Sequence, residues 1–172
     1  MKKFVALLMA LCLLGACALA EEVPVVNWED VDIESTGIEG NYYTFDSVAV
    51  VVWIPTVLEN LELTAEEAEG GLIGKFEVAD GSAGIYVQHL TGNEGATMDD
   101  LLAGLEANGA KDIERCVLNG LDAASYSLPD ADAIYVVFVT EAGNYVQFVM
   151  TPVSDEGFAS VAQIVTASIQ PE

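Results

Sequence analysis

Beyond residue 42, most of the chain consists of short strand-forming segments joined by turns of a few residues. These segments are rich in valine, isoleucine and aromatic side chains, which pack well on a pleated surface, and they span residues 42–54, 72–78, 84–90, 113–118, 121–128, 133–140 and 145–151. Asp80-Gly81 and Asn119-Gly120, dipeptides typical of tight hairpin turns, lie in two of the links. Because parallel neighbours need a connection of a dozen or more residues, these links predict a mostly antiparallel sheet.

Two longer helices and one short helical turn separate the strand segments. Thr97 is a good helix cap and Asn108-Gly109 is a stop signal, so a helix is predicted between them. Its apolar residues recur at helical spacing and are Met98, Leu101, Leu102 and Leu105. A second apolar stripe predicts a final helix over residues 154–169.

The short helical turn is expected over residues 65–69. Thr64 and Glu67 form the spacing of a capping box, in which each side chain bonds the other residue's backbone N–H. The order of strands, helix, strands and helix predicts an α+β domain whose two main helices pack on the sheet. Residues 133–140 are apolar on both faces, so we expect them near the centre of the sheet.

The N-terminus has the pattern of an export signal. Lys2 and Lys3 precede an apolar run of eleven residues, 4–14, which is too short to span a bilayer. Ala18-Leu19-Ala20 is a small-x-small cleavage site, so residues 1–20 are predicted to be a signal peptide cut after Ala20. The alternative is a lipobox, with cleavage before Cys17 and lipidation of that cysteine. The protein is thus expected to be exported, either secreted or anchored at the cell surface as a lipoprotein.

Residues 21–41 are an acidic lead-in or linker in this interpretation, with Trp28 packing onto the edge of the domain. Residues 42–172 form a single α+β domain. The length suits one hydrophobic core, and we expect the domain to be a monomer.

The charge of the exported part excludes one class of partner. All 28 acidic residues follow residue 20, and only three basic residues remain with them, so the net charge there is −25. Nucleic acid binding needs Lys and Arg to release counterions from the phosphates, and it is not expected here. Anionic lipid headgroups are repelled in the same way, so membrane attachment is expected only through lipid at Cys17.

Few residues offer nucleophilic or acid–base chemistry. His89 is the only histidine, which excludes zinc sites that need two. Cys116 is the only cysteine beyond Cys17, and we expect a small buried strand residue there without an activating base. The stretch 69–76, EGGLIGKF, lacks the phosphate-loop spacing and leads into a strand. We therefore predict no catalytic residues and no cofactor.

Acidic loops and tyrosines leave two binding hypotheses open. The acidic loops contain Glu29, Asp30, Asp32, Glu34, Asp130 and Asp132. These loops, at residues 29–34 and 130–132, could recruit calcium. Neither loop has the calcium-loop pattern, so no metal ligand is assigned. The tyrosines could line a sheet face that binds a ligand or peptide. They could equally pack at the edge of the core, with their hydroxyl groups reaching water. The six tyrosines are Tyr42, Tyr43, Tyr86, Tyr126, Tyr135 and Tyr145.

The layout and several strand phrases resemble PsbP-like domains. The phrases are FDSVAVVVWIP, EGGLIGKFEVADGSAGIYV, LNGLDAASY, AGNYVQFVM and IVTASIQ, and the resemblance spans residues 42–170. It implies a central antiparallel sheet flanked by helices. It also implies a non-enzymatic accessory or binding role, as in extrinsic photosystem II proteins, and supplies no catalytic set.

The expected function is therefore an exported, non-catalytic binding or accessory domain, whose partner is an unidentified protein or small molecule. Two alternatives stay open: a small secreted hydrolase that uses acidic residues or His89, and a calcium-dependent surface module.

Overall fold

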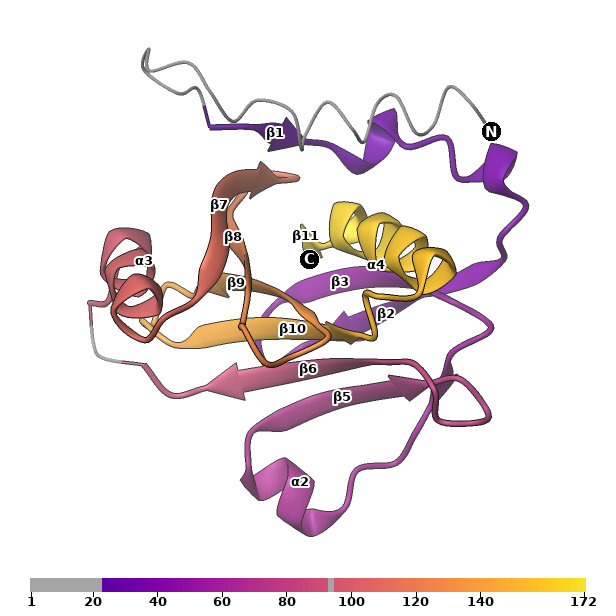
Figure 1. Cartoon of the computed structure of the whole chain (residues 1–172), viewed down its shortest axis with the longest axis horizontal. Helices are drawn as coiled ribbons and strands as arrows, with labels where there is room; N and C mark the ends of the chain where they lie inside the picture. The colour runs from indigo at the N-terminus through magenta and orange to yellow at the C-terminus, as the bar shows by residue number, and fades with distance from the viewer. Residues whose placement is uncertain (1–22, 93–94) are drawn as a thin grey trace.

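The computed structural model describes residues 23–92 and 95–172. Cys17 and both cleavage sites lie outside these residues. Within them the strands form an eight-stranded sheet and a three-stranded sheet (Figure 1). In spatial order the larger sheet consists of β1 (Val25–Val26), β7 (Lys111–Leu118), β8 (Leu121–Ser127), β9 (Ile134–Val139), β10 (Tyr145–Thr151), β6 (Gly84–Leu90), β5 (Leu72–Glu77) and β4 (Glu59–Asn60). The smaller sheet consists of β11 (Gln170–Pro171), β3 (Val50–Pro55) and β2 (Gly40–Phe45).

The helices are α2 (Ala65–Glu69), α3 (Met98–Ala107) and α4 (Glu156–Ser168), with short 3-10 turns η1 (Trp28–Asp30) and η2 (Glu34–Thr36). The predicted α+β class, with two main helices on a mostly antiparallel sheet, is confirmed. Among the described residues every strand pair is antiparallel except β1 with β7. The predicted capping box at Thr64, the predicted cap at Thr97 and both predicted hairpins are present as well, because each rests on side chains close together in sequence. The cap at Thr97 is itself a capping box, which it forms with Asp100.

The strand β9 occupies the centre of the larger sheet, as its sequence predicts. It pairs with β8 on one side and with β10 on the other. Val136, Val137 and Phe138 are all buried. They are covered on both faces because the sheet has a hydrophobic cluster on each side.

The main core lies between the larger sheet and a second layer formed by the smaller sheet and α4. Phe76, Phe148 and Val52 meet there with the apolar face of α4, represented by Val165. On the opposite face of the larger sheet, α3 covers a smaller cluster that includes Ala124 and Val137.

The sequence did not predict a separate smaller sheet. The segment predicted at residues 42–54 forms β2 and β3, joined by a turn; these two strands pair with each other, and β3 also pairs with β11. Almost the whole of β3 is buried, because one face meets the main core and α4 lies beside it. Strand propensity specifies neither the sheet a strand joins nor its partners, so this arrangement depends on tertiary packing.

None of the helices formed by residues 23–92 and 95–172 has the length and hydrophobicity needed to cross a membrane.

Candidate functional site

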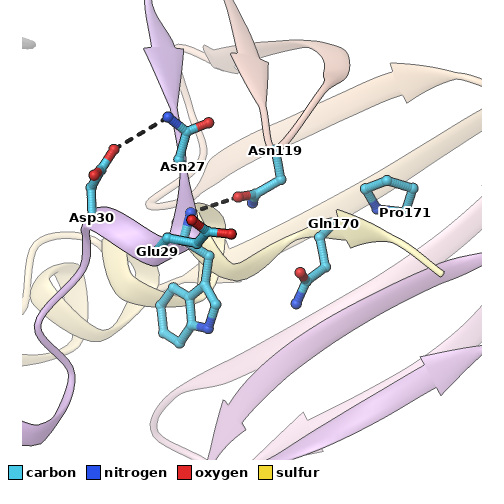
Figure 2. Close-up of a pocket in the computed structure, with 7 residues that line it drawn as sticks. Asn27, Glu29, Asp30, Asn119, Gln170 and Pro171 are labelled. Carbon is cyan, nitrogen blue, oxygen red and sulfur yellow. Dashed lines mark hydrogen bonds between the residues drawn. The ribbon is translucent and has the colours of Figure 1, made fainter.

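The candidate site is a pocket where the N-terminal segment meets the end of the β7–β8 hairpin and the C-terminal strand. These parts come from the beginning, middle and end of the chain and lie close together (Figure 1). The cavity has a volume of about 470 Å³, and its lining residues are Asn27, Trp28, Glu29, Asp30, Asn119, Gln170 and Pro171 (Figure 2).

Asn119 connects the three parts. Its side-chain N–H group donates to the carbonyls of Ala167 at 2.8 Å and Ile169 at 2.7 Å, which lie at the end of α4. Its Oδ1 accepts the backbone N–H of Trp28 at 2.5 Å. The backbone of Asn119 is left-handed (φ 48°), as is that of Gly120 (φ 90°), which is the geometry of a tight hairpin turn. The turn therefore orients the Asn119 side chain toward Trp28 of the N-terminal segment and toward the end of α4.

Trp28 forms an aromatic wall of the pocket. Its ring centroid lies 5.9 Å from that of Trp53, at an interplanar angle of 37°. The indole N–H donates to the hydroxyl of Tyr42 at 2.7 Å. Trp53 in turn packs on Gly40, where an added Cβ would lie 2.2 Å from the ring. Only glycine leaves room there, so the tryptophan pair has a defined position.

The polar groups of the pocket are acids and amides. Asn27 donates to Asp30 at 3.2 Å, and Figure 2 shows Asp30 on the side of the pocket away from Gln170. The carboxylate of Glu29 is directed toward the side of Gln170. Within the described part of the chain, neither Glu29 nor Gln170 has a side-chain hydrogen bond or ion pair. Their oxygens are therefore free to accept from a bound molecule, and Gln170 is also free to donate.

His89 and Cys116 lie outside this pocket. His89 is half-buried on β6, where its register partner on β10 is Val146. Cys116 is half-buried on β7 and packs against the main core. Burial, followed by the negative charges of Glu114 and Asp122, raises the pKa of the Cys116 thiol to about 11. This environment makes a poor nucleophile, in line with the expected structural role.

The acidic stretches do not form one cluster. Asp32 accepts the backbone N–H of Ser35 at 3.2 Å, outside the pocket. Asp132 accepts the backbone N–H groups of Val153 at 3.0 Å and Ser154 at 2.8 Å. These bonds connect the β8–β9 loop to the segment before α4. Among residues 23–92 and 95–172, no group of three or more His, Cys, Asp or Glu side chains is arranged to hold a metal ion.

Several tyrosines are occupied by the protein's own side chains. Tyr126 stacks on Tyr135 with centroids 4.8 Å apart, and its hydroxyl donates to Gln147 at 2.6 Å. Gln147 donates onward to Gln88 at 2.9 Å. Burial raises the pKa of Tyr126 to about 12. The hydroxyl of Tyr86 donates to Glu77 at 2.9 Å. The tyrosine-bearing face is therefore partly a packed hydrogen-bond network.

Sequence reasoning missed most of the pocket. It placed Trp28 at the domain edge and noted Glu29 and Asp30, but it did not connect them with Asn119 or Gln170. The Asn119-Gly120 signal predicts a turn, and with it a left-handed asparagine whose side chain is free to bond elsewhere. The partners of that side chain are 48, 50 and 91 residues away, and no local pattern specifies them.

Comparisons with known proteins agree with this fold. No protein family model matches the chain, and no curated protein matches it. The solution structure of cyanobacterial PsbP (CyanoP) from Synechocystis matches with a TM-score of 0.57 and 12% identity, over 92% of this chain and 99% of that one. A crystal structure from Bacteroides thetaiotaomicron matches with a TM-score of 0.50 and 16% identity, over 78% of this chain and 49% of that one. The fold is PsbP-like, and at these identities the similarity establishes the fold alone.

Proposed function

We propose that this chain is an exported, non-catalytic binding domain and that the pocket beside Trp28 is its ligand-binding site. The observation that carries this proposal is the convergence of three distant segments on one cavity. An oriented aromatic ring lines it, together with two polar side chains, Glu29 and Gln170, that have no partner in the described part of the chain. Small-molecule sites combine these features: a concave surface, an apolar wall and a few polar groups that fix orientation.

The fold supports an accessory role. The resemblance to PsbP-like domains implies a protein that acts by binding. The charge of −25 over residues 21–172, which follows from 28 acidic and three basic residues, keeps such a domain soluble and monomeric. An unidentified small molecule or protein is the partner.

Export and anchoring form part of the same proposal. Cleavage after Ala20 would release the domain with Glu21 at its N-terminus, whereas lipidation at Cys17 would tether it through an acidic spacer. The intact mass of the mature protein distinguishes the two forms. An N-terminus at Glu21 would contradict the lipoprotein alternative, and a lipidated Cys17 would contradict release.

Neither alternative function is favoured by a specific observation in the described residues. A hydrolase that depends on His89 would lose activity in a His89→Ala variant. A specific structural calcium site would raise the thermal unfolding midpoint in calcium relative to chelator.

Intrinsic fluorescence offers a direct test of the binding proposal. Trp28 and Trp53 are the only two tryptophans in the chain; Trp28 lines the pocket, and the ring of Trp53 lies against it in a tilted arrangement. A panel of sugars, amino acids, amines and carboxylic acids should therefore contain a compound that changes the emission saturably. NMR shift mapping should place that compound at residues 27–30, 119 and 170–171. A bound compound that perturbs only other residues would contradict the assignment of the site.

A further inference from the structure

We infer that the pocket beside Trp28 selects a ligand with an organic ammonium group. This inference rests on the proposed function, because it assumes that the pocket binds a ligand. It goes further by assigning the charge and chemical class of that ligand.

Every charged side chain in the lining is acidic. Glu29 and Asp30 contribute carboxylates, and the remaining lining residues are amides, Trp28 and Pro171. The free carboxylate of Glu29 faces the side of the pocket where Gln170 lies (Figure 2). A bound ammonium group would thus meet one ionised acceptor and one neutral amide oxygen. Charge-assisted hydrogen bonds of this kind are about twice as strong as neutral ones.

The basic residues of the described chain do not compensate for these acids. Lys75 pairs with Glu67 at 2.8 Å, and Arg115 pairs with Asp99 at 2.8 Å and with Asp122 at 2.6 Å. Lys111 is the first residue of β7, whereas Asn119 follows the last. At about 3.3 Å per strand residue, Lys111 lies roughly 25 Å from the pocket. Charges at that distance are screened at physiological ionic strength.

The aromatic wall suits a cation as well. Trp28 has a fixed orientation because its indole N–H bonds Tyr42 and its ring packs on Trp53. Tryptophan is the side chain whose ring face attracts cations most strongly, within about 6 Å of the centroid. A sugar could also stack on this ring. The negative lining, however, favours a cation over a neutral ligand of the same shape and opposes an anion.

Matched small molecules test the choice of charge. Putrescine and 1,4-butanediol have the same four-carbon chain, but only putrescine carries ammonium groups. Putrescine should change the tryptophan emission saturably, whereas 1,4-butanediol and the dianion glutarate should bind at least about tenfold more weakly, equivalent to about 1.4 kcal/mol. Calorimetry should give the same ranking.

Matched variants test the position of the site. Glu29→Gln removes an exposed carboxylate without a partner in the described residues, and should weaken putrescine binding about tenfold, the usual size for a charged hydrogen bond. Glu141→Gln makes the same charge change in the exposed β9–β10 turn, outside the lining, and should change the affinity less than about twofold because exposed charges are screened. Both variants should retain the wild-type unfolding midpoint.

A lysine peptide distinguishes two sources of the ammonium group. The peptide acetyl-Ala-Lys-Ala-amide presents a lysine side chain as a partner protein would, and putrescine represents a free amine. Tighter binding of either one supports the inference and identifies the source. Equal binding of putrescine and 1,4-butanediol, or equal weakening by Glu29→Gln and Glu141→Gln, would overturn it. The proposed pocket would still stand if another compound of the panel mapped to it, whereas binding of amines elsewhere on the protein would contradict both proposals.

Discussion

Asn119 combines two requirements that separate residues usually meet. Its left-handed backbone closes the β7–β8 hairpin, and its side chain bonds the end of α4 and the backbone of Trp28. Asparagine tolerates the left-handed conformation better than most residues. It also carries both a donor and an acceptor, so no other side chain of similar size fits both roles equally well.

Substitution of Asn119 should separate these two contributions. Asn119→Gly keeps the left-handed turn but removes the three side-chain hydrogen bonds, and should lower the free energy of unfolding by about 2 kcal/mol. Asn119→Ala should cost about 1 kcal/mol more, because the methyl group disfavours a positive φ. Urea unfolding of both variants measures the difference. An alanine variant as stable as the glycine variant would contradict the backbone part of this account.

Cys116 should be slow to react in the folded protein. With its pKa raised to about 11 from the ordinary thiol value of 9.0, the thiolate fraction at pH 8 is about 100-fold smaller than for a free thiol. Iodoacetamide labelling of Cys116 should be slower by at least that factor and should recover in urea. The Cys116→Ser variant measures background labelling. Fast labelling of the folded protein would show that the thiol is less shielded than its packing indicates.

The short helix α2 is held to the β5–β6 hairpin by one ion pair. Glu67 closes the capping box with Thr64 and also bonds Lys75 of β5 at 2.8 Å. The hydrogen bond from Lys75, followed by those from Thr64, lowers the pKa of Glu67 from 4.5 to about 2. A helix of five residues has little stability of its own, so these contacts position it.

The sign of the resulting pH dependence follows from that lowered pKa. The unfolded chain protonates Glu67 at a higher pH than the folded chain, so the stabilisation is fully present above pH 4.5 and declines as the pH falls toward 2. The free energy of unfolding of a Glu67→Gln variant should therefore fall less steeply than that of the wild type across this range.

Glu66→Gln is the control for this measurement, because it removes a neighbouring charge and leaves the Lys75 contact intact. It should retain the wild-type slope of stability against pH. Equal slopes for the wild type and Glu67→Gln would show that the ion pair does not persist in solution.

At the scale of the whole molecule, self-repulsion is the main electrostatic feature. Three basic residues accompany 28 acidic ones after residue 20, and two of the three already form ion pairs. Most carboxylates therefore have no cation nearby, and their mutual repulsion opposes the compact state.

Salt should therefore stabilise the protein. Raising sodium chloride from about 10 to 200 mM shortens the screening length and should raise the thermal unfolding midpoint by several degrees. Calcium and magnesium chlorides at equal ionic strength should give equal shifts if screening is the cause. A midpoint that falls with salt would contradict this expectation, and a larger shift with calcium alone would favour the calcium-dependent alternative.

Local signals predicted the elements well. The capping box at Thr64, the helix cap at Thr97 and the turn at Asn119-Gly120 each involve residues within three or four positions, so their energetics do not depend on the rest of the fold. The assignment of segments as strands or helices was also correct because it rests on the side-chain pattern of neighbouring residues. The short links between strands predicted the antiparallel pairing.

The sequence by itself therefore determined the type of each longer element, the antiparallel hairpins, the central place of β9 and the strongly negative charge. Only the tertiary structure decided that β2 and β3 form their own sheet and that β1 lies beside β7. It alone brought Trp28, Asn119 and Gln170 to one pocket. The physical reason is that local bonds are specified by adjacent residues. Contacts across 91 residues, in contrast, depend on how the packed sheets and α4 bring Trp28 and the C-terminal strand to the β7–β8 turn.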